Sequence, residues 1–288
     1  MFGFLNVYKP SGMTSFDVVA YIRRITHIKQ IGHTGTLDPF ATGILPICIG
    51  KSTKLIEYLP DDKEYIATVK FGSDTDTYDL DGKVVKEYDN EISQEQLENV
   101  LNYFKGQIEQ YPPKYSAIKV NGKKLYEYAR NGQDIQIEPR KVTIHKIELL
   151  DFDKYNQIAK ILVCCSKGTY IRSIAYDIGQ KLDCGGHLIA LERTKAGMFA
   201  LETSIKLEAI KSIEDVKNNL INPHEVLPQE KYILSDSEKE RIIHGMSIKL
   251  SNNCLTNDIV FLLYSGKMIA VGVRNDNKIK VKKVFEVL

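Results

Sequence analysis

The sequence contains no long apolar run and few cysteines. No stretch approaches the about eighteen apolar residues of a membrane-spanning helix, and the first residues do not combine a basic segment with a cleavable apolar one. We therefore expect a cytoplasmic protein that does not enter a membrane. The 5 cysteines stand at positions 48, 164, 165, 184 and 254, without paired spacing. This distribution predicts reduced and mostly buried thiols.

Two common cofactor motifs are also incomplete. The glycine-lysine-serine run at residues 50–52 follows an apolar stretch, but Leu45 stands where a phosphate-binding loop requires glycine. Cys184 and His187 have the spacing of zinc ligands, yet no second clustered pair accompanies them. We therefore expect no bound metal and no nucleotide or other cofactor.

The small net charge of +2 conceals an uneven distribution. Residues 1–54 hold 6 Lys and Arg against 2 acidic residues, and residues 112–146 hold 8 against 3. Residues 57–100 instead carry 13 acidic residues against 4 Lys. Such blocks indicate a protein with a basic and an acidic side that binds a polyanion locally. Ordinary solvated surface charge is the alternative for any single block.

The length of 288 residues and the 43% hydrophobic content suit one large or two ordinary domains with a real core. Residues 213–231 are charged and contain Pro223 and Pro228, which interrupt the preceding pattern. We place a boundary there, with domains at residues 1–230 and 231–288. The second domain offers a helix near residues 238–244 and strands at residues 259–264, 268–273 and 279–287.

Strands outnumber helices in the first domain. Helical spacing or capping residues predict helices within residues 14–25, 52–58, 93–104, 125–130 and 169–182. Apolar runs or alternation predict strands at residues 44–49, 65–71, 115–120, 141–152 and 157–165, with turns at residues 121–122 and 155–156. Because neighbouring strands are joined by turns, we expect the α+β class with a mixed, largely antiparallel sheet.

The chain is organised around residues 32–43, which read GHTGTLDPFATG. Three glycines and a proline in twelve residues exclude a helix or a central strand and predict a shaped loop. This loop presents Asp38 beside His33, and the apolar run that follows would anchor it in a core. A single acid on a rigid loop indicates a site, although an Asp before Pro can also cap neighbouring amides in a turn.

Residues 32–46 resemble the catalytic motif of the TruB family of tRNA pseudouridine synthases, whose nucleophilic aspartate falls at Asp38. Four further blocks of the family occur in the same order, and together the blocks cover residues 3 to about 195. They are residues 9–15, Tyr65 with residues 75–79, residues 115–119 and residues 166–172.

The resemblance implies three catalytic residues. Asp38 is the nucleophile, Arg172 is its ion-pair partner, and Tyr65 stacks on the target uracil and removes a sugar proton. An ionised carboxylate suits covalent glycosyl chemistry, and an arginine beside it would keep it charged and oriented. Without the resemblance, Arg172 would be read as a surface charge and Tyr65 as an ordinary strand aromatic.

The resemblance implies five more residues as substrate-binding. His33 would occupy the space that an extruded base vacates, and Tyr170 and Leu191 would line the uracil pocket. Lys9 and Asp79 complete this set. Core packing is the alternative for Tyr170 and Leu191.

The implied activity is isomerisation of the T-loop uridine at position 55 of tRNA to pseudouridine, a redox-neutral reaction that needs no cofactor. The implied partner is the T stem-loop of tRNA, with no obligate protein partner and a monomeric chain. The C-terminal segment resembles the small β-barrel PUA domain that binds RNA. Two alternatives stay open: a guide-RNA-dependent synthase of the dyskerin type, and a non-catalytic tRNA-binding or tRNA-folding protein.

Overall fold

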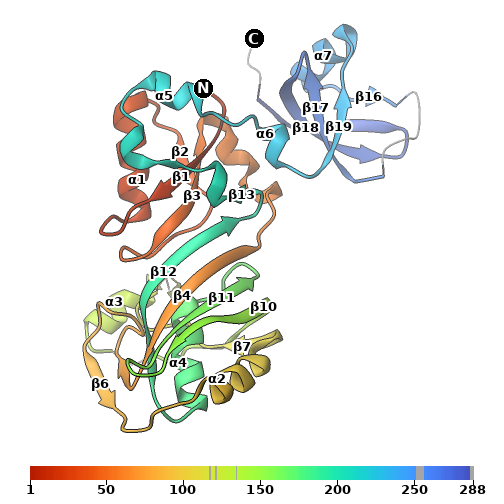
Figure 1. Ribbon diagram of the computed structural model, residues 1–288. Coiled ribbons are helices and arrows are strands. Elements are labelled where there is room, and N and C mark those ends of the chain that lie inside the picture. Colours follow the sequence, from red (N-terminus) through yellow and green to blue (C-terminus); the bar gives the residue numbers. More distant parts are fainter. Residues whose placement is uncertain (117, 121, 134, 251–255, 286–288) are drawn as a thin grey trace.

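A computed structural model of the chain describes residues 1–116, 118–120, 122–133, 135–250 and 256–285, and its largest unit is a ten-stranded sheet (Figure 1). β2 (Ile31–His33) pairs with β3, and β13 (Phe199–Ala200) pairs with β12. All strand pairs of this sheet are antiparallel except β1 with β14 and β3 with β12. The expected mixed, largely antiparallel sheet is therefore confirmed. The main path follows the order β14 (Ile205–Lys206), β1 (Gly3–Lys9), β3 (Thr42–Ile49), β12 (Gly186–Ala196), β4 (Lys63–Phe71), β11 (Ile158–Cys165), β10 (Arg140–Asp153), β7 (Gly106–Gln110).

The long strands β4 and β12 join the two halves of the sheet (Figure 1). Their register opposes Arg193 to Tyr65 and Leu191 to Ala67. On its other edge β12 runs parallel to β3 and opposes Arg193 to Gly43. The end of the motif loop, Arg193 and Tyr65 thus lie on three adjacent strands at the middle of the sheet.

Helices α1, α2 and α4 contribute to the largest core with the sheet. α1 begins at a capping box in which the Thr14 side chain and the Asp17 side chain each bond the other's backbone N–H. Its Val18, Val19 and Ile22 are buried against the sheet. The helices are α1 (Ser15–Thr26), α2 (Gln94–Leu101), α3 (Leu125–Arg130), α4 (Ile171–Lys181), α5 (Ile213–Asn218), α6 (Pro223–Val226) and α7 (Asp236–Ile243), with 3-10 turns η1 (Gly50–Tyr58), η2 (Asn102–Phe104), η3 (Leu201–Thr203) and η4 (Leu207–Ala209).

A second sheet of five strands forms the C-terminal β domain, and it packs on the first part of the chain through a shared apolar cluster. In this cluster the Tyr58 ring meets Phe261 edge-on at 5.8 Å, and Phe2 stacks on Phe285 at 5.1 Å. The Nζ of Lys283 donates to the Lys54 carbonyl beside this cluster. The strands follow the order β15 (Glu230–Ile233), β17 (Ile259–Tyr264), β18 (Lys267–Asn275), β19 (Lys278–Val284), β16 (Ile248–Lys249).

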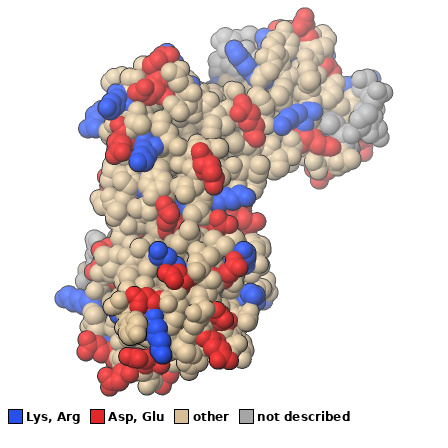
Figure 2. All heavy atoms as spheres, viewed as in Figure 1, with Lys and Arg blue, Asp and Glu red and all other residues tan. Residues whose placement is uncertain are grey.

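Two small hairpins complete the structure, β5 (Ser73–Thr75) with β6 (Val84–Glu87), and β8 (Lys119–Val120) with β9 (Lys123–Lys124). The expected strand at residues 115–120 is therefore wrong for its first half, where the described residues form a loop. Figure 2 shows acidic side chains gathered at the end of the molecule that carries β5 and β6. The expected turn residue Asn121 and the end of the last expected strand, Val287, lie outside the described residues.

Other expectations fail where the chain context overrides the local pattern. The central strand β12 was not expected, because its Leu-Ile-Ala-Leu-Glu-Arg run has helix-forming composition that only the neighbouring strands override. Residues 213–231, where we place the domain boundary, contain the short helices α5 and α6. Ser52 does not cap η1, since its hydroxyl donates to the carbonyls of Gly3 and Ile49.

Four of the five cysteines lie in the described part of the chain. Cys48, Cys165 and Cys184 are buried and Cys164 is half-buried, and all four are free. Cys254 lies outside the described residues. Within the same residues, none of the helices has both the length and the apolar character needed to cross a membrane.

Candidate active site

The motif loop is held in a fixed shape between β2 and β3. These strands include its two ends, so the exclusion of a strand is wrong for residues 32–33 and 42–43. The Ser15 hydroxyl at the start of α1 accepts from the Leu37 N–H at 2.8 Å and donates to the Leu37 carbonyl at 3.1 Å. Gly12 N–H donates to the Pro39 carbonyl at 2.9 Å. Leu37 is buried, so the residue next to Asp38 is anchored in the core. The side chain of Asp38 remains 32% exposed and faces the cleft.

Two buried cations support the loop from below. Arg193 is fully buried, and its Nε donates to the Ile44 carbonyl at 2.6 Å while its Nη2 donates to the Gly35 carbonyl at 3.0 Å. A Cβ on Gly43, whose φ is +104°, would lie 2.3 Å from the Arg193 carbonyl oxygen, so only glycine fits there. These contacts explain why the loop ends in glycine.

Lys9 is fully buried and does not line the cleft. Its Nζ donates to the carbonyls of Pro10 at 2.8 Å, Met13 at 2.7 Å and Pro39 at 3.2 Å. Burial lowers the pKa of Lys9 to about 8, although the nearby Asp38 charge acts in the opposite direction. Its ammonium group thus joins the first turn to the motif loop in this structure, and contact of Lys9 with substrate stays a prediction.

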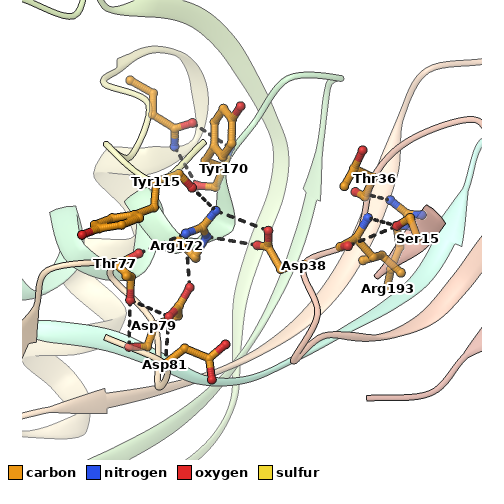
Figure 3. A network of polar contacts seen from close by, with 12 residues as sticks. Ser15, Thr36, Asp38, Thr77, Asp79, Asp81, Tyr115, Tyr170, Arg172 and Arg193 are labelled. Atoms are coloured by element: carbon orange, nitrogen blue, oxygen red, sulfur yellow. Dashed lines mark hydrogen bonds and ion pairs between the residues drawn. The ribbon is translucent and has the colours of Figure 1, made fainter. Parts of the chain in front are cut away.

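Arg172 of α4 connects two carboxylates (Figure 3). Its Nε lies 3.0 Å from Asp38 Oδ2, and its Nη2 donates to Asp38 Oδ1 at 3.3 Å. The Nε–H is not aimed at the oxygen, so the first contact is an ion pair rather than a hydrogen bond. Nη1 lies 3.2 Å from Asp79 Oδ2. The remaining donors reach the carbonyls of Thr77 and Tyr115, each at 3.1 Å.

Asp79 is buried and belongs to this network rather than to the cleft wall. Its Oδ1 accepts from the Thr77 hydroxyl at 2.5 Å and from the Asp81 N–H at 3.1 Å. A direct contact between Asp79 and substrate, as expected from the sequence, stays a prediction. The carboxylate instead fixes the guanidinium of Arg172, which has only 7% of its side chain exposed.

The net electrostatic effect on Asp38 is governed by burial. Burial raises the pKa of Asp38 above its ordinary value, Arg172 lowers it, Asp79 raises it and Lys9 lowers it, in descending order of effect. The arginine therefore limits the cost of ionising a desolvated carboxylate instead of making Asp38 unusually acidic. A carboxylate of this kind is more basic and more nucleophilic than a solvated one.

Aromatic and apolar side chains surround Asp38. Tyr65 on β4 and Leu191 on β12 are nearly buried and line the cleft together with His33 and Tyr170. Burial raises the pKa of Tyr65, and the Arg193 charge lowers it by less. Tyr65 is therefore a neutral phenol at neutral pH, which suits stacking and makes it a weak base. Burial and the Arg193 charge lower the pKa of His33, which favours its neutral, stacking form.

The cleft has a volume of about 770 Å³ and is large enough for a nucleoside. The structure brings together Asp38, Arg172, Tyr65, Tyr170 and Leu191 from four distant segments of the chain. This arrangement can hold a flat, uncharged base between apolar groups with one ionised carboxylate at its edge. Among the described residues, no group of three or more His, Cys, Asp or Glu is placed to hold a metal ion.

Sequence reasoning missed several groups that shape the site. Arg193 could have been identified as a site residue only from its position opposite the end of the motif loop. That position follows only from the order of the strands in the sheet. The carbonyls of Thr77 and Tyr115 carry no signal in side-chain patterns. Gln110 was also missed: its amide accepts from Tyr170 N–H at 2.7 Å and donates to the Tyr170 carbonyl at 3.0 Å, which fixes the start of α4.

Several solved structures contain a chain with this fold, and two of them serve as examples. A chain of "Crystal Structure of a Cbf5-Nop10-Gar1 Complex" is 26% identical with a TM-score of 0.71, and the match covers 99% of this chain and 85% of that chain. A chain of "Structure of H/ACA RNP bound to a substrate RNA containing 2'-deoxyuridine" is 24% identical, also with a TM-score of 0.71. This match covers 99% of this chain and 86% of that chain. Both matches show that this chain has the fold of those chains.

The sequence comparisons specify the family. Residues 23–171 match the TruB family pseudouridylate synthase (N terminal domain), and residues 172–229 match the tRNA pseudouridylate synthase B C-terminal domain. The tRNA pseudouridine synthase B of Clostridium tetani is 44% identical over 291 residues, which are 99% of this chain and 100% of that protein. The tRNA pseudouridine synthase B of Caldanaerobacter subterraneus subsp. tengcongensis is also 44% identical, and the match covers 98% of this chain and 99% of that protein. The chain belongs to the TruB family of pseudouridylate synthases.

Proposed function

We propose that the chain isomerises the T-loop uridine at position 55 of tRNA to pseudouridine, with Asp38 as the nucleophile. The observation that carries this proposal is the Asp38 carboxylate at the floor of an aromatic-lined cleft, ion-paired with the buried Arg172. Relatives described as tRNA pseudouridine synthase B over nearly their whole length support tRNA as the substrate. A tRNA substrate also supports a cytoplasmic location for the enzyme.

The chemistry needs one bond broken and one formed. The N1–C1′ bond of uridine breaks, the uracil turns, and a C5–C1′ bond forms while C5 loses a proton and N1 gains one. The Asp38 carboxylate attacks either the sugar or the base, and both courses require it to be ionised. Tyr65, Tyr170 and Leu191 enclose the detached base, so that it can turn without leaving the cleft.

Protein contacts must compensate for the stacking energy that an extruded base loses. Unstacking costs a few kcal/mol, and His33 at the cleft wall offers a flat, neutral ring that can fill the vacated space. Lys63 and Lys167 also line the cleft and place positive charge near the path of the RNA backbone. Lys167 pairs with Asp61 at 2.7 Å, so its charge is partly balanced.

The C-terminal part, residues 231–288, is proposed to be an RNA-binding domain of the PUA type. Its exposed Lys278 and Lys280 on β19 suit phosphate contacts. Lys282 and Lys283 of the same strand point instead to Glu57 in the first part of the chain. Because the two parts share an apolar cluster, point substitutions test this role better than truncation.

The proposal is tested by incubating the purified chain with an unmodified tRNA transcript in buffer without a cofactor. Mapping of the product should show pseudouridine at position 55 and at no other uridine, and Asp38→Asn should abolish it. Formation of pseudouridine only after addition of a guide RNA and partner proteins would indicate the dyskerin type. Tight tRNA binding by the wild-type chain without any isomerisation would indicate a tRNA-binding or tRNA-folding protein.

A further inference from the structure

Phe16 lies at the rim of the cleft and is 60% exposed, which is unusual for a phenylalanine. It lies in the first turn of α1 and lines the same cleft as Asp38 and His33. Its neighbour Ser15 bonds both backbone groups of Leu37, the residue before Asp38. The start of α1, which carries Phe16, is therefore joined directly to the motif loop.

The ring of Phe16 is also supported from behind. The guanidinium carbon of Arg23, two helical turns further on, lies 5.4 Å from the ring centroid. Arg23 is held in turn, because its Nη2 donates to the Ile31 carbonyl of β2 at 2.7 Å. β2 ends in His33, so the Phe16 ring and the His33 ring are both fixed to the same short strand. This support lowers the entropy cost of presenting the ring to a ligand.

The outer face of α1 carries the residue types that bind nucleic acids. Phe16 shares this face with Ala20, Arg23 and His27, while Arg24 beside it is exposed and lies over the Tyr21 ring at 5.3 Å. An aromatic ring set among basic side chains is the usual combination for binding bases and phosphates together. Core packing does not explain a Phe on this face.

We propose that Phe16 is a positioning residue that stacks on the nucleobase next to the extruded uridine. This inference rests on the proposed function, because it takes an RNA loop as the ligand. When a uridine leaves the stack, its neighbour loses a stacking partner, and an exposed ring at the rim of the cleft replaces it. The stack fixes the position of the loop over Asp38, whereas His33 fills the vacated space and Tyr65 contacts the extruded base itself.

Binding of a T-stem-loop RNA to Phe16→Ala, measured in an Asp38→Asn background to prevent turnover, tests the stack. The dissociation constant should rise roughly 5- to 50-fold, as expected for loss of one base–aromatic stack. Phe16→Trp should retain the affinity, and Phe16→Leu should lose most of it. The slope of affinity against salt should not change, whereas Arg24→Gln should reduce it. Tyr155→Ala, which removes a 97% exposed ring on the β10–β11 turn, is the matched control and should bind normally.

A second measurement identifies the stacked base. RNAs with an abasic nucleotide on one or the other side of the target uridine form a double-mutant cycle with Phe16→Ala. One of the two abasic RNAs should bind equally to both forms of the protein. An equal loss on all RNAs, or unchanged affinity of Phe16→Ala for the intact RNA, would overturn the inference. So would wild-type affinity of Phe16→Leu, since an apolar contact rather than a stack would then explain the residue.

Folding and activity separate this inference from the proposed function. Phe16 is exposed and alanine has the higher helix propensity, so Phe16→Ala should unfold at the wild-type temperature. In the active protein, Phe16→Ala should raise the half-saturating RNA concentration much more than it lowers the saturating single-turnover rate. Lack of isomerisation by the wild-type chain would reject the proposed function. Wild-type activity together with an unchanged half-saturating concentration in Phe16→Ala would reject only the stack.

Discussion

The Asp79 carboxylate lies 3.2 Å from Nη1 of Arg172, while Asp38 occupies the Nε and Nη2 edge of the same guanidinium. One buried cation is thus shared by two carboxylates with different exposure, 6% for Asp79 and 32% for Asp38. The less exposed carboxylate balances the charge of the arginine and fixes its plane. The more exposed one is left at the cleft, where it can react.

The first prediction concerns the charge of Asp38. Asp38→Asn keeps the size of the side chain but removes the proposed nucleophile, so the single-turnover rate should fall by a factor on the order of 10⁴ or more. Binding of tRNA should change little, because the side chain contributes shape more than affinity. Asp89→Asn, an exposed acid outside the cleft, is the control. Multiple turnovers by Asp38→Asn would show that another group carries the chemistry.

The second prediction concerns the planar guanidinium group of Arg172. Arg172→Lys keeps the positive charge but cannot serve Asp38, Asp79 and the carbonyls of Thr77 and Tyr115 together. The single-turnover rate at saturating tRNA should fall roughly 100-fold, as for removal of one oriented donor at an active site. Thermal unfolding of the variant shows whether it stays folded. A rate within twofold of wild type would mean that charge alone, without the planar geometry, is sufficient.

The third prediction concerns the pH profile. The Asp79 charge raises the pKa of Asp38, so Asp79→Asn should lower that pKa. Since Asp38 must be ionised to react, the acidic limb of the single-turnover rate should move to lower pH in the variant. The rate at neutral pH should also decrease, because Arg172 loses one of its two ionic contacts. An acidic limb that stays in place, or moves to higher pH, would show that Asp38 does not govern it.

The fourth prediction follows from linkage between protonation and folding. Asp38 has a raised pKa in the folded state, so the folded state binds its proton more tightly than the unfolded state does. Relative to Asp38→Asn, the wild-type protein should therefore lose stability as pH rises from the unfolded-state pKa through the raised folded-state pKa. Above that range Asp38→Asn should be the more stable protein. Urea unfolding of both proteins at several pH values measures the difference, and the opposite slope would mean that the ion pair outweighs burial.

The arrangement of the site could be predicted only in part from the sequence. The motif loop, α1 and its capping residue follow from local rules, because Gly, Pro and Thr-x-x-Asp act on the residues beside them. The mixed sheet was expected from the strand patterns, but not its order. The place of Arg193 depends on β12 lying between β3 and β4, and no local pattern reports a pairing between strands so distant in sequence.

Lys9 and Asp79 show a second limit of sequence reasoning. A charged residue within a motif of an RNA enzyme suggests substrate contact, yet both side chains are buried and satisfied by protein groups. Lys9 bonds three carbonyls, and Asp79 bonds Arg172. Burial depends on how segments pack, so a position in a motif cannot distinguish a residue that contacts substrate from one that supports such a residue.

The last prediction concerns the buried guanidinium of Arg193. It is fully buried, and its donors reach the carbonyls of Gly35, Thr36 and Ile44 on both arms of the motif loop. Arg193→Leu would leave these acceptors without a partner, so unfolding in urea should show a loss of roughly 3 kcal/mol or more. Arg193→Lys can restore some of the bonds and should lose less.

The same pair of variants distinguishes support of the loop from general stability. If Arg193 sets the position of Asp38, then Arg193→Lys should fold at room temperature and still have a lower single-turnover rate at saturating tRNA. Arg24→Leu removes an exposed arginine of α1 and should be as stable as wild type, which controls for the loss of one charge. Because Asp38 lies between the arms that Arg193 joins, a shift of either arm would move the carboxylate relative to Arg172. Wild-type stability together with a wild-type rate in Arg193→Leu would show that the other contacts of the loop, from Ser15 and Gly12, are sufficient to hold it.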